Sequence, residues 1–374
     1  MLIGWIYHFF LSLPLCAFAR EKIKGFRKRG DMNPLITRLE QRCVTREERF
    51  ENIRTLLLTP AEEFEEARAH AHSITLREFG RGVFVCGLLA FSNICRNDCT
   101  YCGLRVSNAA LPRMRLTVED IMRAVERFRE TDLDRVFLVS GEDRSYSTGD
   151  ICRAVAHAKS LGFHVTLGLG EYPEDALMAF GDAGCGCYTL KFETSNRDLF
   201  RRCKPTSDYE DRMRCIRSVK PLGMELGSGN ILGLEGQTVD DVARDILLME
   251  ELGIDWAPVV PYLPAPGTPM AATTPMGNVA LLLREISILR ILMPHAIITG
   301  GQPSQGSTLG FADPGGNRDA LASGANILFV DITPHALRRD FQITPGRILP
   351  GVSHVDSLLA GAGLERVRRE EKKV

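Results

Sequence analysis

The sequence predicts an α/β protein built as a (β/α)8 barrel of the TIM type, with a helical cap at its N-terminal side. From Val83 onward, eight short apolar runs alternate with longer segments of helical periodicity. Repeated strand–helix–strand units pair in parallel through right-handed crossovers. Several helical segments end in glycine just before the next strand, as at Gly162, Gly223 and Gly253. A chain of 374 residues is long enough to form such a barrel as one domain.

Residues 1–31 form an apolar and then basic extension. The apolar part ends in Ala17-Phe18-Ala19, which resembles a signal-peptidase site, but the cluster of Lys and Arg follows it instead of preceding it. Two alternatives stand: an over-extended start, with translation beginning at Met32, or an N-terminal membrane anchor with a basic flank. We favour the first. The 11 cysteines show no even disulfide ladder, so we expect a reducing compartment and a cytoplasmic protein.

Residues 32–80 read as an N-terminal helical segment, in which Thr59 and Pro60 open the last helix. Residues 81–374 carry the barrel and a C-terminal extension. The expected strands cover residues 83–91, 135–139, 163–169, 188–192, 225–232, 256–262, 296–299 and 326–330. The expected helices cover residues 118–130, 148–161, 174–183, 209–222, 239–252, 277–292 and 317–323. Polar or Gly-rich residues follow every strand, which predicts an active site at the carboxyl ends of the strands.

Three cysteines, Cys95, Cys99 and Cys102, follow the first strand with C-x3-C-x2-C spacing. Soft thiolates clustered this tightly suit an iron–sulfur cluster or zinc, and three ligands leave one coordination position open. A zinc site or a set of buried thiols is the alternative. The net charge of −1 gives no global basic character, so we expect no nucleic-acid partner.

This cysteine spacing, with Tyr101 just before the last cysteine, resembles the signature of the radical S-adenosylmethionine (SAM) superfamily. The resemblance implies that Cys95, Cys99 and Cys102 hold one [4Fe–4S] cluster, whose fourth iron chelates the amine and carboxylate of SAM. In that superfamily an electron from the cluster cleaves SAM to a 5′-deoxyadenosyl radical, which attacks the substrate.

Within the superfamily the chain is most similar to the HydE family of [FeFe]-hydrogenase maturases, with biotin synthase and methylornithine synthase as further relatives. The matching stretches are 91–95, 101–105, 140–143, 169–171, 190–194, 233–238 and 264–269. The resemblance implies a role in H-cluster maturation, on a small-molecule substrate such as a cysteine-bound iron complex. It also implies an electron donor such as ferredoxin or flavodoxin, and other hydrogenase maturases as partners.

The same resemblance assigns roles to further residues, most of them at the strand ends. Those expected to bind SAM are Ser140, Gly141, Glu142, Glu193 and Arg212. An arginine fork and carboxylates are what a zwitterionic amino acid requires. For Glu142 and Glu193, an ion pair with a nearby arginine is the alternative to contact with the SAM ammonium. Thr166 and Lys191 correspond to residues near a substrate anion site at the barrel centre.

Several positions depart from the family pattern. Lys191 stands where the family has arginine, Glu235 replaces a proline, and Leu337 and Phe341 stand where tyrosines are expected. These departures leave the substrate open, and two other hypotheses stand beside the HydE-like one. One is a radical SAM enzyme acting on a different small substrate, such as a methylornithine-synthase-like mutase or a biotin-synthase-like sulfur enzyme. The other is a cluster-carrying scaffold without turnover.

Overall fold

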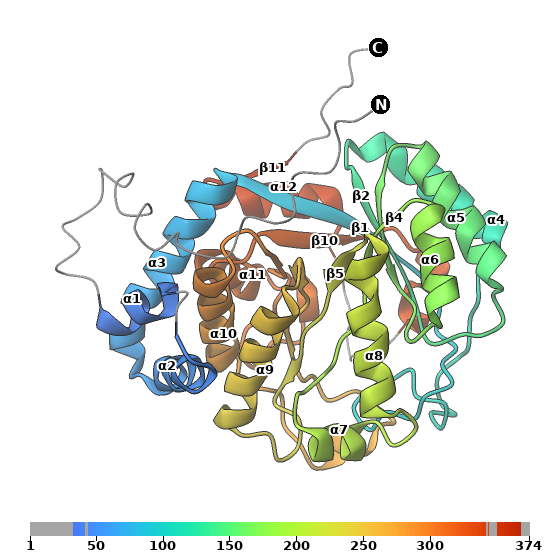
Figure 1. Cartoon of the computed structure of the whole chain (residues 1–374). Coiled ribbons are helices and arrows are strands. Elements are labelled where there is room, and N and C mark those ends of the chain that lie inside the picture. The colour runs from blue at the N-terminus through green and yellow to red at the C-terminus, as the bar shows by residue number, and fades with distance from the viewer. Residues whose placement is uncertain (1–32, 42–43, 342, 344–349, 368–374) are drawn as a thin grey trace, which may run out of the picture.

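The computed structural model describes residues 33–41, 44–341, 343 and 350–367. Within these residues, eight parallel strands form the wall of a barrel surrounded by helices (Figure 1). In ring order the strands are β10 (Ile327–Asp331), β1 (Gly82–Ser92), β2 (Arg135–Ser140), β3 (His164–Gly168), β4 (Cys185–Thr189), β5 (Glu225–Gly227), β7 (Trp256–Ala257) and β9 (Ile297–Ile298). A parallel bridge between Thr299 and Ile327 links the end of β9 back to β10. The ring is therefore nearly closed, and the predicted fold class is confirmed.

Helices cover the outside of the barrel between successive strands. They are α4 (Val118–Phe128), α5 (Thr148–Ser160), α6 (Glu174–Asp182), α8 (Tyr209–Val219), α9 (Val239–Leu252), α10 (Val279–Leu292) and α11 (Pro314–Ala322). Three of them begin with a capping box in which Thr117, Ser147 or Thr238 exchanges hydrogen bonds with an aspartate three residues later. Their apolar faces pack on the strands, so the main hydrophobic core lies between the strands and the helices.

The N-terminal helices α1 (Pro34–Glu40), α2 (Arg46–Leu58) and α3 (Ala61–Phe79) lie on the outside of the barrel, where they contact α9, α10 and α11 (Figure 1). The N-cap of α3 is Pro60, whereas Thr59 ends α2, so the predicted cap was one residue off. Near the C-terminus, α12 (Val352–Gly361) is followed by β11 (Glu365–Arg366), which pairs with β1. None of the described helices is long and apolar enough to span a bilayer. The two alternatives for residues 1–31 concern a segment outside the described residues.

Three predicted strands need correction. The fourth strand runs from Cys185 to Thr189 instead of the predicted 188–192, so Cys185 and Cys187 lie within it. Leu190 and Phe192 are buried beyond the point where pairing ends, and an apolar run cannot show where the ladder stops. The fifth and sixth predicted strands each break in two. Their second halves, β6 (Ile231–Leu232) and β8 (Val260–Pro261), form a separate two-stranded sheet.

Three aromatic side chains fill the interior of the barrel, and we call them the aromatic floor: Phe137, Trp256 and Phe329. The ring centroids of Phe137 and Trp256 are 5.3 Å apart, and the Phe329 ring lies 6.3 and 5.8 Å from these two. Glycines on neighbouring strands make room for the rings. A Cβ at Gly168 would come within 2.7 Å of the Phe137 ring, and one at Gly227 within 3.0 Å of Trp256.

Candidate active site

A cavity of about 340 Å³ lies at the carboxyl ends of the strands, directly above the aromatic floor. All three cysteines of the C-x3-C-x2-C motif line it. So do most of the other residues predicted for the site: Ser140, Gly141, Glu142, Lys191, Glu193 and Arg212. The fold thus brings together residues from the ends of several strands, as the barrel topology predicts.

The loop that carries the cysteines runs close against the end of β2. The backbone amide of Gly141 donates to the carbonyl of Ser92 at 2.9 Å, and the backbone amide of Arg96 donates to the carbonyl of Glu142 at 3.3 Å. A Cβ at Gly141 would lie 2.2 Å from the carbonyl oxygen of Ile94 and 2.8 Å from the Cβ of Cys95. Only glycine fits at this crossing, so Gly141 has a steric role in placing the loop.

Two backbone amides point at the first cysteine of the motif. The Sγ of Cys95 accepts from the amides of Asn97 at 3.5 Å and Glu142 at 3.4 Å. Burial raises the pKa of the Cys95 thiol, and it raises that of Cys102 as well. Both thiols are therefore neutral on their own, and a bound metal centre would have to deprotonate them, as metals do.

The three thiols of the motif are the soft donors of this cavity. Among the described residues, no three His, Cys, Asp or Glu side chains are placed to hold one metal ion. A single-ion zinc site requires such convergence, whereas the thiolates around an iron–sulfur cluster each bind a different iron. The thiols of Cys95, Cys99 and Cys102 line one cavity, and soft thiolates of this kind suit an iron–sulfur cluster.

Lys204 is a functional residue that the sequence analysis missed. It follows α7 (Arg197–Cys203), a short helix that was also not predicted, and its Nζ donates to Cys99 Sγ at 3.4 Å. Burial, the largest single effect, lowers the pKa of Lys204, but the negative charges of Cys99, Glu193 and Glu142 together raise this pKa above its ordinary value. The detectable signal was Asn196, whose side chain caps the N-terminus of α7 by accepting from two amides.

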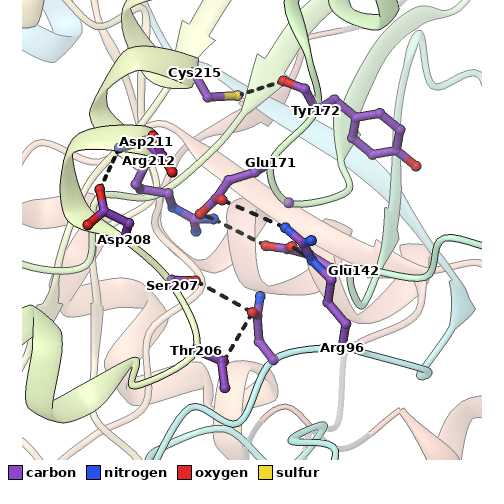
Figure 2. A network of polar contacts seen from close by, with 12 residues as sticks. Arg96, Glu142, Glu171, Tyr172, Thr206, Ser207, Asp208, Asp211, Arg212 and Cys215 are labelled. Atoms are coloured by element: carbon purple, nitrogen blue, oxygen red, sulfur yellow. Dashed lines mark hydrogen bonds and ion pairs between the residues drawn. The ribbon is translucent and has the colours of Figure 1, made fainter.

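Four charged side chains form a closed circuit of contacts that we call the ion-pair ring: Arg96, Glu142, Arg212 and Glu171 (Figure 2). Arg96 contacts Glu142 at 2.9 Å and Glu171 at 3.8 Å. Arg212 contacts the same two carboxylates at 3.4 and 3.1 Å. Glu142 is thus paired with both arginines of the ring.

The ring joins the cysteine loop to α8 and to the ends of β2 and β3. Arg96 is its exposed member, whereas Arg212 and Glu142 are buried. Burial alone would raise the pKa of Glu142, yet Arg212, Lys204 and Arg96 together lower it. Burial would likewise lower the pKa of Arg212, but Glu193, Glu142 and Glu171 raise it. Both groups therefore stay charged inside the protein.

Glu193 has a backbone conformation that is unusual for a residue other than glycine. Its φ is +67°, and it is buried after the end of β4. Backbone hydrogen bonds on both sides hold it, to the Gly229 carbonyl at 3.1 Å and from the Ile231 amide at 2.9 Å. Such conformations persist where the surroundings enforce them and cluster at ligand sites. The Glu193 carboxylate contacts Arg212 at 3.6 Å and Lys191 at 3.8 Å.

The two residues predicted for the substrate lie in different places. Lys191 lines the cavity, and burial lowers its pKa although Glu193 opposes the shift. Thr166 is buried in β3, paired in register with Phe137 and Cys187, at the level of the aromatic floor. It is not among the residues that line the cavity. Its role toward a substrate stays a prediction.

A buried acidic pair lies behind Lys191, on the outer helices. Asp245 on α9 and Glu285 on α10 are fully buried, and Asn230 lies close to both. Burial raises the pKa of Asp245 to about 7 and that of Glu285 to about 8. Both oxygens of Glu285 lack a hydrogen-bond donor within the described part of the chain. Glu285 is therefore protonated at neutral pH.

Comparison with known proteins agrees with this geometry. The [FeFe] hydrogenase maturase subunit HydE of Thermotoga maritima is 35% identical over 278 residues, which span 74% of this chain and 78% of that protein. Biotin synthase of Maridesulfovibrio salexigens is 29% identical over 232 residues, spanning 60% of this chain and 70% of that protein.

Among solved structures, the crystal structure of methylornithine synthase (PylB) superposes with a TM-score of 0.75 at 23% identity, covering 89% of this chain and 97% of that one. This likeness concerns the fold. The model of the radical SAM superfamily matches residues 89–249, which include the cysteine loop, the ion-pair ring and Glu193. The family implies a [4Fe–4S] cluster and SAM as cofactors. The chain is an enzyme that belongs to the radical SAM superfamily.

Proposed function

We propose that this enzyme reductively cleaves SAM at one [4Fe–4S] cluster held by Cys95, Cys99 and Cys102, and that it acts in maturation of the [FeFe]-hydrogenase H-cluster. The observation that carries the proposal is that the three thiols share one cavity with Glu142, Glu193 and Arg212. The similarity to HydE supports the role in maturation.

When bound, the cluster supplies the electron that cleaves SAM to a 5′-deoxyadenosyl radical. The protein's own residues bind and orient the amino-acid part of SAM. Arg212 offers a guanidinium fork for a carboxylate, and Glu142 offers a carboxylate for an ammonium group. Ser140 and Gly141 shape the edge of the cavity beside them, and Glu193 is held in place for the ribose or the amine. The aromatic floor closes the cavity from below and keeps water out of the barrel interior.

The cluster and its chemistry are tested by anaerobic reconstitution of the full chain. We expect about four irons per chain, an electron paramagnetic resonance (EPR) signal after dithionite, and release of 5′-deoxyadenosine from SAM. Cys99→Ala should lose the EPR signal and the 5′-deoxyadenosine, whereas the matched control Cys152→Ala, on α5 and away from the cavity, should keep both. A chain that binds one zinc and leaves SAM intact would contradict the proposal. A cluster without SAM cleavage would favour the scaffold hypothesis.

The role in maturation is tested by complementation of a strain that lacks its HydE. Recovery of hydrogenase activity would support a small-molecule substrate such as a cysteine-bound iron complex, the other maturases as partners, and ferredoxin or flavodoxin as the electron donor. The expression of the Cys99→Ala variant in the same strain is the control, since it should give no recovery.

A second candidate is a radical SAM enzyme with a different small substrate, such as a methylornithine-synthase-like mutase or a biotin-synthase-like sulfur enzyme. The aromatic floor favours it, because Phe137, Trp256 and Phe329 occupy the barrel centre, where the substrate anion site was expected. Lys191, which replaces the family's arginine, also favours it, since an ammonium group cannot form the bidentate contact of a guanidinium. Failure of complementation by a protein that cleaves SAM would favour this candidate.

A further inference from the structure

Lys204 places a buried positive charge on one particular cysteine of the motif. Its Nζ lies 3.4 Å from the Sγ of Cys99, and only 4% of the residue is exposed. The contacts of the other sulfurs differ in kind, since Cys95 receives two neutral backbone amides. The ammonium of Lys204 is therefore in hydrogen-bond contact with the Cys99 sulfur.

The fold fixes Lys204 against the cysteine loop on both sides. The amide of Thr100, which follows Cys99, donates to the carbonyl of Cys203 at 2.8 Å. The amide of Asp98, which precedes Cys99, donates to the Thr206 hydroxyl at 2.9 Å. Thr206 in turn donates to the side chain of Asn97 at 3.2 Å. Residues 203–206 and the loop are thus held together around the Cys99 sulfur, so the backbone of Lys204 is fixed beside it.

A cation held next to a cluster sulfur affects the two oxidation states unequally. One-electron reduction makes the cluster one unit more negative, forms no bond and needs no proton. Net charge and hydrogen bonds to the sulfurs are among the factors that set the reduction potential of such clusters. Because the attraction to Lys204 grows with negative charge on the cluster, it stabilises the reduced form more than the oxidised form.

We propose that Lys204 raises the reduction potential of the [4Fe–4S] cluster by its contact with the Cys99 sulfur. Lys204 does not touch the reacting atoms; it is a positioning residue whose charge acts on the cluster through the ligand Cys99. The inference rests on the proposed function, since it needs the cluster to be held by Cys95, Cys99 and Cys102. The electron itself comes from an external donor, dithionite in the test and a low-potential electron carrier in the cell.

The test is an EPR-monitored redox titration of the reconstituted full chain without SAM. In Lys204→Met, we expect the equilibrium constant for one-electron reduction to fall about tenfold or more, which corresponds to a potential lower by about 59 mV. Lys204→Arg keeps the charge and should stay near the wild-type potential. Lys220→Met, which removes a lysine paired with Asp255 at the opposite end of the barrel, should not change it.

A second neutral variant, Lys204→Gln, guards against a folding defect of the methionine variant, and iron content and thermal unfolding are measured for both. Neutral variants with a full cluster and the wild-type potential would overturn the proposal, even if they bind SAM more weakly. An unchanged potential together with weaker SAM binding would instead assign Lys204 to SAM binding. It differs from failure of the proposed function, in which the wild-type chain itself takes up no four-iron cluster and both proposals fall.

Discussion

Replacing Gly141 by alanine tests whether the end of β2 positions the cysteine loop. The added Cβ would lie 2.2 Å from the Ile94 carbonyl oxygen, about 1.2 Å short of the 3.4 Å at which ordinary contact begins. Neither neighbour is a flexible side-chain end, because one is backbone and the other is the Cβ of Cys95. The loop must therefore shift by about 1 Å, although functional constellations tolerate only about 0.5 Å. Overpacking of this kind costs about 1–3 kcal/mol of folding free energy.

We expect Gly141→Ala to fold but to take up less than half the iron of the wild type on anaerobic reconstitution, and to lose most of its SAM cleavage. The matched control is Gly149→Ala in the first turn of α5, where the nearest atom to an added Cβ is 3.7 Å away. It should match the wild type in iron content and unfolding midpoint. Wild-type iron content and SAM cleavage in Gly141→Ala would refute the close-approach reasoning.

Three further outcomes are expected. The pKa of Glu285 is about 8, against an ordinary value of 4.5, so the folded state keeps a proton that the unfolded chain releases. The stabilising contribution of protonated Glu285 is therefore full below pH 4.5 and is lost as the pH rises to about 8. Glu285→Gln should flatten this dependence and stabilise the protein above pH 8 by a few kcal/mol, roughly 1.4 per pKa unit, in urea unfolding; parallel curves for the two proteins would contradict it. Arg212→Met removes the buried cation shared by Glu142, Glu171 and Glu193, which keep Arg96 and Lys191 as partners. The substitution should cost about 3–5 kcal/mol and more than tenfold in SAM affinity by calorimetry, whereas unchanged affinity would remove Arg212 from the SAM site. Trp256→Ala should destabilise the protein by about 3–5 kcal/mol in the same unfolding assay, and a loss below 1 kcal/mol would show that the aromatic floor is loosely packed.

The sequence was informative where local pattern and topology decide the structure. The spacing of Cys95, Cys99 and Cys102 identified the loop, and the family resemblance pointed to Glu142 and Arg212, which lie in the same cavity. The prediction for Glu142 also depended on which strand it follows, and the order of strands in a parallel barrel leaves little freedom.

Contacts between segments far apart in the chain were not predictable. Lys204 lies 105 residues from Cys99, and no short-range pattern links the two. The aromatic floor likewise depends on which side chains of β2, β7 and β10 point inward at the same level. Strand ends were misplaced near Leu190 because burial continues after the ladder stops, and hydrophobicity reports burial, not hydrogen bonding.

The ion-pair ring has a consequence for how strongly the site responds to salt. It holds two guanidinium groups and two carboxylates in alternation, so its formal charges cancel. An amino-acid ligand brings one ammonium and one carboxylate, and it can take the place of one cation and one anion in this arrangement without changing the total. When the ammonium and carboxylate of the ligand bind, they exchange partners within a set of charges that stays neutral. We therefore expect the affinity of the site for this amino-acid group to vary little with ionic strength.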